Sequence, residues 1–430
     1  MAEKSDFSPM MQEYLKTKEQ YQDCILFYRL GDFYEMFFDD AIKASKELEL
    51  TLTGKLCGQE ERAPMCGIPY HAADVYIAKL IERGYKVAIC EQLEDPKKAK
   101  GIVKRGVIRI VTPGTVIESN LLDEKENNYI MSIYKSGTYF GISACDISTG
   151  DFRATQIKEI NNFPKLLDEI SRYTPAEIVV NPFMFDSEDE IAQIKERFEI
   201  YVSRVKEEAF TNSNNEIKEE DLKTQNQINE SEDSVNLNIN KTSEIQKVSK
   251  IEERFSFVNE HDEKIENTNK YELAINSING LLYYLTDTQK SSLDHINKII
   301  FYSITKYMAL DISARRNLEI TEKLRDKSKK GTLLWVLDKT STSMGGRLLR
   351  RWLNDPLIDV FEINERLRSS SRTKRKHNTK RRCNRFIKKS LRYGTPNSSY
   401  CVWKCNWKRF NFIKEFMQTT SKCKKSFNKL

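Results

Sequence analysis

The stretch ILFYRLGDFYEMF, residues 25–37, decides how the beginning of this 430-residue chain folds. Its first four residues are apolar and predict a buried strand. Gly31-Asp32 supplies a turn, and the aromatic run FYEMF after it predicts a second strand. Helical and further strand patterns continue to residue 115. We therefore expect residues 1–118 to form one compact, mixed α/β domain.

From the residues alone, Phe33 and Glu35 have two interpretations. An aromatic side chain on a strand is usually part of the core, and Glu35 would then be a solvated neighbour. An exposed Phe33 would instead be a wedge that enters a stack of nucleic-acid bases, which costs least where pairing is already broken. A carboxylate beside phosphates would weaken binding to intact duplex. Its pKa would rise there, so that it could donate a hydrogen bond to a base.

The charge of the chain is unevenly distributed. The formal net charge is +7, but residues 368–430 contain 20 Lys and Arg against one acid, Glu415, which gives +19. The remaining 367 residues hold 50 basic and 62 acidic side chains, a net charge of −12. A basic domain is the usual electrostatic footprint of nucleic-acid binding. Here the excess belongs to the tail, so net charge does not argue for a nucleic-acid partner.

Composition indicates a soluble, globular chain with polar segments, 39% hydrophobic and 31% charged. No run approaches eighteen apolar residues, so we expect no contact with a membrane. The first residues, MAEKSD, lack the apolar core of a signal peptide. Nine cysteines, an odd number without a disulfide framework, favour a reducing cytoplasm.

Beyond the first domain the pattern changes three times. Residues 128–270 alternate strand and helix, which predicts a second α/β domain. Within it, residues 211–270 contain eleven Asn and no Gly, Pro, Cys or Trp, so we expect a disordered insertion. Residues 271–367 read as helical, with an apolar stripe that stops at Asn354-Asp355-Pro356.

The basic tail, residues 368–430, breaks the helical pattern. Between residues 368 and 385 the only apolar residue is Cys383, so a helix that needs a buried face is not expected to continue there. The loss of acids and of periodicity suggests an out-of-frame reading of the gene. The alternative is a basic tail specific to one lineage, and the sequence of the coding DNA would decide between them.

Motifs for catalysis are missing from the sequence. A P-loop requires G-x-x-x-x-G-K-[ST], but the Gly-Lys pair, Gly54-Lys55, is followed by Leu56. The four histidines are scattered, and Cys401 and Cys405 do not have the spacing of a zinc site. Asp146 is a single candidate for a metal-dependent nuclease, without identifiable partners. We expect no catalytic residue, metal or cofactor site in this chain.

Several stretches together resemble the bacterial MutS mismatch-repair family. They are SPMMQEYL (8–15), FYRLGDFYEMF (27–37), PMCGIPYH (64–71), AICEQ (88–92), RIVTPGT (109–115), LDISARRNLE (310–319) and GGRLLRRWL (345–353). The resemblance covers residues 1 to about 367, apart from the insertion, and not the basic tail.

The resemblance implies a multidomain α/β protein with a mismatch-recognition domain at residues 1–118. A connector domain with a ribonuclease-H-like fold would follow at 128–270, and the start of a helical core and lever at 271–367. Phe33 and Glu35 would fill the Phe and Glu places of the family's Phe-x-Glu motif. In the family, this Phe stacks on the mispaired base from the minor groove and the Glu bonds it.

The resemblance also implies partners and cofactors for the full-length family. Such proteins form homodimers that clamp mismatched double-stranded DNA, use ATP and Mg in a weak ATPase, and recruit a downstream repair protein. The ATPase and clamp regions of the family lie downstream of residue 430, so this chain is not expected to be catalytic by itself. The alternative function is a truncated fragment with little or no specific DNA binding.

Overall fold

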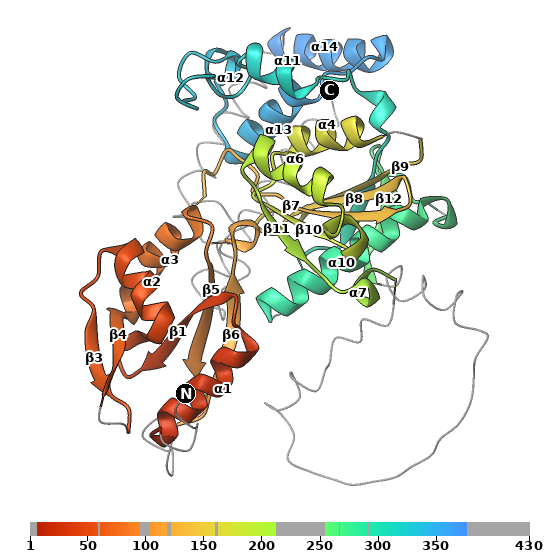
Figure 1. Ribbon diagram of the computed structural model, residues 1–430. Helices are drawn as coiled ribbons and strands as arrows, with labels where there is room; N and C mark the ends of the chain where they lie inside the picture. Colours follow the sequence, from red (N-terminus) through yellow and green to blue (C-terminus); the bar gives the residue numbers. More distant parts are fainter. Residues whose placement is uncertain are drawn as a thin grey trace, which may run out of the picture.

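The structure is a computed structural model that describes most of the chain before the basic tail (Figure 1). The described residues are 7–58, 61–94, 103–117, 122–159, 162–211, 254–265, 267–290, 293 and 295–375. Within them lie two sheets with their covering helices, followed by a helical region. The predicted multidomain α/β class is confirmed. No helix among these residues is long and apolar enough to cross a membrane.

The first domain is built on a six-stranded sheet with the strand order β3-β4-β2-β1-β5-β6. Its elements are α1 (Pro9–Gln20), β1 (Cys24–Leu30), β2 (Phe33–Phe37), α2 (Phe38–Leu48), β3 (Thr53–Leu56), β4 (Arg62–Pro69), α3 (Ala73–Glu82), β5 (Lys86–Gln92) and β6 (Arg105–Val111). β1 pairs antiparallel with β2 and parallel with β5. The strand–turn–strand prediction for residues 25–37 is confirmed, with Gly31 at φ +60° in the turn, where glycine avoids a steric penalty.

Apolar side chains cover both faces of this sheet. On one face Phe27, Met36 and Leu80 belong to a core formed with α2 and α3. On the other face Tyr28 and Phe37 pack with the α1 side chains. The alternation of side chains along β2 therefore sends Tyr34 and Met36 to the first core, and Phe33, Glu35 and Phe37 to the α1 side.

The second domain has a seven-stranded sheet with the strand order β11-β10-β7-β8-β9-β13-β12. Its strands are β7 (Ile130–Ser136), β8 (Tyr139–Asp146), β9 (Asp151–Ile157), β10 (Glu177–Val180), β11 (Tyr201–Arg204), β12 (Ser256–Asn259) and β13 (Lys298–Phe301). Its helices are α4 (Phe163–Tyr173), α5 (Pro182–Phe185), α6 (Glu188–Phe198), α7 (Glu207–Thr211) and α10 (Glu272–Gln289). α10 packs on one face, and α4 and α6 on the other (Figure 1).

The structure extends this second domain beyond the boundary at residue 270 that the sequence suggested. α10 crosses β8 so closely that a Cβ at Gly141 would collide with the Leu273 carbonyl, and β13 pairs with β9. The sequence placed both elements in a helical third domain. Instead α10 covers the second sheet and β13 is one of its strands, which residue periodicity does not reveal.

Part of the predicted disordered insertion is also ordered in this sheet. β12 pairs in parallel with β13, and Phe255, Phe257 and Val258 are buried. These apolar residues lie at the end of a long polar stretch, so its average composition concealed them. Residues 212–253, the greater part of the predicted insertion, lie outside the described residues.

The region after β13 is helical, as predicted, and includes α11 (Ile312–Asn317), α12 (Leu333–Leu337), α13 (Ser343–Asn354) and α14 (Val360–Arg375). α14 does not stop where the basic tail begins, so the expectation that no helix continues past residue 367 is wrong. The side chains of residues 368–371 are exposed, which means that this part of the helix needs no buried face. Residues 376–430 lie outside the described part of the chain.

A buried carboxylate joins the first domain to the second. Glu177 in β10 is fully buried and accepts hydrogen bonds from Thr112 Oγ1 at 2.5 Å, Ser203 Oγ at 2.8 Å and Tyr284 OH at 2.5 Å. Thr112 follows the last strand of the first domain, whereas Ser203 and Tyr284 belong to the second. Buried hydrogen bonds to a charged group are strong and directional. The hydrogen bonds of Glu177 therefore form a joint that holds the end of the first domain against the second domain.

Candidate nucleic-acid interface

Phe33 begins strand β2 and exposes 48% of its surface. Its Cα partners are Leu30 in β1 and Pro69 in β4, so the backbone is held on both sides although the ring is not covered. This exposure excludes the interpretation of Phe33 as a core residue. A large aromatic ring on a rigid strand is suited to stacking on another flat ring.

Phe33 is exposed because α1 packs over the other end of this face of the sheet. Phe37 shares that face but is buried, because the Tyr14 ring on α1 lies 4.9 Å from it. Phe33 stands at the opposite end of the same strand. Its exposure therefore depends on where α1 packs, and not on local sequence.

Glu35 lies between these two aromatic residues on the same face and forms an ion pair with Lys55. The distance from Lys55 Nζ to Glu35 Oε2 is 2.5 Å, and the side chains are 33% and 16% exposed. Gly67, opposite Glu35 in the neighbouring strand, presents no side chain, and a Cβ there would lie 3.5 Å from Glu35 Cγ. The carboxylate is thus neutralised by a partner that water reaches.

The turn before Phe33 is braced by groups that the sequence analysis did not single out. The backbone amide of Tyr70 donates to the Asp32 carbonyl at 3.0 Å, and Arg29 Nε donates to the Gly31 carbonyl at 2.5 Å. The Arg29 guanidinium also lies 3.7 Å from the centre of the Tyr70 ring. Tyr70 is half-exposed, so a second aromatic ring and a cation lie near the Phe33 turn.

Sequence reasoning missed Lys55, Tyr70 and Arg29 as neighbours of the site. Lys55 was considered only as part of a phosphate loop, but Gly54 and Lys55 lie in strand β3. The one available indication was that the sequence GIPYHA, residues 67–72, is typical of a turn that leads into a helix. Strand register is needed to place that turn beside Phe33, and register is a long-range property.

Asp146 does not belong to a metal site among the described residues, where no group of potential metal ligands gathers. Its carboxylate accepts hydrogen bonds from Ser148 N and Oγ at 2.9 and 2.7 Å and from Asn127 Nδ2 at 2.7 Å. Burial raises the pKa of this carboxyl, although the hydrogen bonds oppose the rise. Asp146 therefore organises the β8–β9 turn.

Of the remaining sequence candidates, His71 lies near the Phe33 turn, and the others lie elsewhere or outside the described residues. His71 is exposed and contacts the Tyr70 ring edge-on. His295 Nε2 lies 2.8 Å from the Ile147 carbonyl, and His261 lies 3.7 Å from a carboxylate oxygen of Glu362. His377, Cys401 and Cys405 lie outside the described residues.

Comparison with protein families finds three consecutive matches. Residues 8–120 match MutS domain I, residues 128–297 match MutS domain II, and residues 313–392 match MutS domain III. The second match includes α10, in agreement with its packing on the second sheet. The third continues through residues 368–392, so the expectation that the resemblance leaves out the whole basic tail is wrong for these residues.

Comparison with curated proteins finds relatives of the same kind. The chain is 51% identical over 369 residues to a DNA mismatch repair protein MutS of Ruminiclostridium cellulolyticum, a match that covers 86% of this chain and 38% of the relative. It is 52% identical over 363 residues to the protein with that name from Acetivibrio thermocellus, covering 84% and 37%. The chain thus spans little more than a third of the length of these relatives.

Proposed function

Because the chain belongs to the MutS family, as an N-terminal portion of it, we propose that its first domain recognises mispaired or looped-out bases in double-stranded DNA. In this proposal the Phe33 ring inserts from the minor groove and stacks on the displaced base, and Glu35 forms a hydrogen bond with that base. The observation that carries the proposal is the exposure of Phe33 on a strand held from both sides.

The wedge selects its site through the deformability of DNA. Insertion of an apolar ring unstacks a base step, at a cost of a few kcal/mol. The cost is smaller where pairing is already broken, since less pairing energy is lost. A protein that makes no base-specific contact can thus still prefer mismatched sites.

The negative charge of Glu35 increases the preference for mismatched over matched DNA. A carboxylate near the DNA phosphates disfavours intact duplex, and at a mismatch the hydrogen bond to the displaced base offsets that repulsion. Lys55 neutralises Glu35 in the free domain through the 2.5 Å ion pair. On DNA, the long Lys55 side chain turns toward a phosphate and frees the carboxylate for the base.

The wider functions of the family are proposed for the whole protein of which this sequence is part. They are a homodimeric clamp, a weak ATPase that uses ATP and Mg, and recruitment of a downstream repair protein. The residues described here do not fit an ATP site: Gly54 and Lys55 lie in a strand, Lys55 is engaged by Glu35, and potential metal ligands do not cluster. We also propose that the protein acts in the cytoplasm, as expected for a DNA-binding member of a bacterial family.

Binding to matched and mismatched duplexes tests the proposal. We expect the full chain to bind a duplex with one unpaired base more tightly than its matched counterpart at moderate salt, and Phe33→Ala to abolish this preference. Phe183→Ala is the control, because Phe183 is also an exposed phenylalanine but lies on α5 in the second domain. Fluorescence anisotropy with labelled duplexes measures both affinities.

The alternative function, a fragment with little specific DNA binding, predicts a different result. Binding would then be equal on the two duplexes, unaffected by Phe33→Ala, and would fall steeply with salt, because the basic tail would supply the phosphate contacts. That outcome would reject the wedge proposal for this chain.

A further inference from the structure

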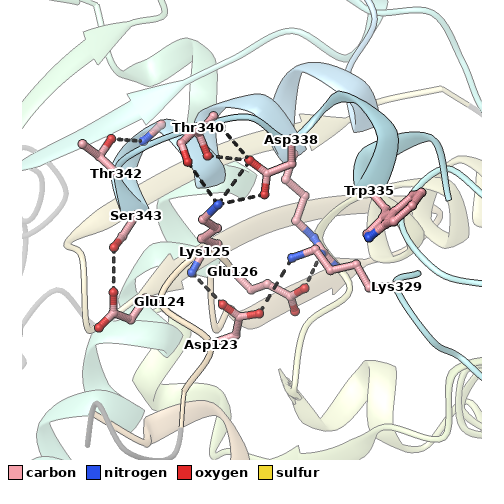
Figure 2. A network of polar contacts seen from close by, with 12 residues as sticks. Asp123, Glu124, Lys125, Glu126, Lys329, Trp335, Asp338, Thr340, Thr342 and Ser343 are labelled. Carbon is pink, nitrogen blue, oxygen red and sulfur yellow. Dashed lines mark hydrogen bonds and ion pairs between the residues drawn. The ribbon is translucent and has the colours of Figure 1, made fainter. Parts of the chain in front are cut away.

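Residues 123–126, Asp-Glu-Lys-Glu, form a linker strap between the first and second domains, and each of the four contacts the helical region (Figure 2). The contacts are Asp123 with Lys329 at 3.9 Å, Glu124 with Ser343 Oγ at 2.9 Å, Lys125 with Asp338 at 3.0 Å, and Glu126 with Arg350. Arg347 also donates to the Glu124 carbonyl at 2.6 Å. Three of the four contacts join opposite charges, and Glu124 accepts from the neutral Ser343, so the strap and its docking site are complementary.

Lys125 is held both by hydrogen bonds of its ammonium group and by packing of its aliphatic stem. Its Nζ donates to both Asp338 oxygens, at 3.0 and 3.2 Å, and to the Thr340 carbonyl at 3.3 Å. Its aliphatic stem lies against Gly346 of α13, where an added Cβ would come within 2.8 Å of Lys125 Cγ. The strap therefore sits directly on the backbone near the start of α13.

The other end of α13 is held in a different way. Asp355, the residue after the helix, accepts two hydrogen bonds from Arg172 of α4, at 2.7 and 2.9 Å. The side chains of this pair are 5% and 9% exposed, against 35% for Lys125 and 52% for Asp123. Salt screens exposed charges strongly and buried pairs far less.

The strap contacts at Ser343 and Gly346 and the buried contact of Asp355 lie at opposite ends of α13, and the Glu126–Arg350 pair lies between them. α13 has 12 residues, which corresponds to a length of about 18 Å at a rise of about 1.5 Å per residue. A helix held by a buried pair at one end and by partly exposed ion pairs toward the other resists displacement unequally. Screening of charge should therefore weaken the strap contacts more than the Arg172–Asp355 pair.

We propose that the linker strap is an ionic latch on the N-terminal part of α13, and that the buried Arg172–Asp355 pair is the pivot about which α13 moves when the latch opens. The latch couples the linker of the first domain to the position of the helical region. Opening it changes the relation between these parts without breaking either domain core.

Hydrogen exchange of the full chain, followed by mass spectrometry, tests this latch. NaCl is raised from about 0.1 M to about 1 M, which shortens the screening length from about 10 Å to about 3 Å. We expect exchange in peptides covering residues 122–127 and 338–347 to accelerate at least about threefold, with residues 351–358 unchanged. Equal acceleration along α13, or none, would overturn the proposal.

Variants locate the effect in the strap. Lys125→Met keeps the aliphatic stem and removes the charge, so it should reproduce the high-salt pattern at low salt. Glu126→Arg should do the same, and the charge swap with Arg350→Glu should restore protection. Lys298→Met is the matched control, because Lys298 of β13 forms an exposed ion pair with Asp262 in the second domain. A variant in which exchange accelerates in all peptides is unfolded. In that case the salt series on the unmodified chain alone tests the latch.

Discussion

The ammonium group of Lys55 lies 2.5 Å from the carboxylate of Glu35, although the two residues are 20 positions apart in the chain. β3 carries Lys55, β2 carries Glu35, and β4 lies between these strands in the sheet. The proposed base-bonding carboxylate is therefore masked by a cation in the free domain. Binding must replace this ion pair, and that requirement makes the pair a testable part of recognition.

Glu35→Gln should narrow the difference between matched and mismatched DNA. A carboxylate about 4 Å from a phosphate costs about 1 kcal/mol in water, so its removal should tighten binding to matched duplex about fivefold. Affinity for the mismatched duplex should change less, because the lost repulsion and the lost base contact oppose each other. Anisotropy titrations at fixed salt measure both, and an unchanged matched affinity would contradict the repulsion argument.

Lys55→Met should act in two ways, through the loss of the Glu35 ion pair and through the loss of the proposed phosphate contact. It leaves the carboxylate without its cation, so binding to both duplexes should weaken. For a partly exposed pair, we expect a coupling energy of about 1 kcal/mol or less in the double-mutant cycle with Glu35→Gln. Additive effects of the two substitutions would show that the ion pair has no part in binding. Lys327→Met controls for the loss of one positive charge.

Thr112→Val should loosen the joint between the first two domains. The substitution keeps the shape of the side chain and removes the hydroxyl that donates to the buried Glu177 at 2.5 Å. We expect a loss of about 1.5–3 kcal/mol in the free energy of unfolding, the range for hydrogen bonds to charged groups. Urea unfolding measures it, and Thr305→Val, which removes a hydroxyl bonded only to exposed Ser303 among the described contacts, should cost much less.

Asp355→Asn should destabilise the attachment of α13 to the second domain. The substitution removes the charge that faces Arg172 in a buried environment. Arg172 would keep Glu169 as a weaker partner, at 3.4 Å. Breaking a buried pair costs about 3–5 kcal/mol in general, and the remaining carboxylate should bring the loss to the lower end of that range. Asp359→Asn, near the start of α14, is the control, and similar losses for both would contradict the buried-pair argument.

Asp151 should contribute to stability in a pH-dependent way. Burial alone would raise the pKa of this carboxyl, but the charges of Arg153 and Arg351 outweigh burial, and the pKa is lowered from its ordinary value of 3.8. A lowered pKa in the folded state means that the contribution is complete above about pH 4 and is lost as the pH falls further. The free-energy difference between the unmodified chain and Asp151→Asn should therefore shrink below pH 4.

Urea unfolding at a series of pH values measures this difference. Asp262→Asn is a suitable control, because Asp262 is an exposed acid paired with Lys298. A difference between the unmodified chain and Asp151→Asn that stays constant from neutral to acid pH would show that the charge of Asp151 contributes nothing.

Much of the first domain was predictable from local sequence. Apolar runs and the Gly31-Asp32 turn predicted β1 and β2, because strand burial and turn chemistry are properties of a few neighbouring residues. The assignment failed for α10, β12 and β13, whose place depends on which sheet their apolar residues cover. It also failed for α14, where a helix continues with an exposed surface.

The sequence by itself determined that the chain belongs to one family and that Phe33 and Glu35 stand two residues apart on a strand. Both can be read from short stretches of consecutive residues, because the family is indicated by matching motifs and a strand by its period of two. Only the tertiary structure decided that Phe33 is exposed, that Lys55 covers Glu35, and that the linker strap lies on α13. These relations depend on strand register and helix packing between segments far apart in the chain, which local propensity does not specify.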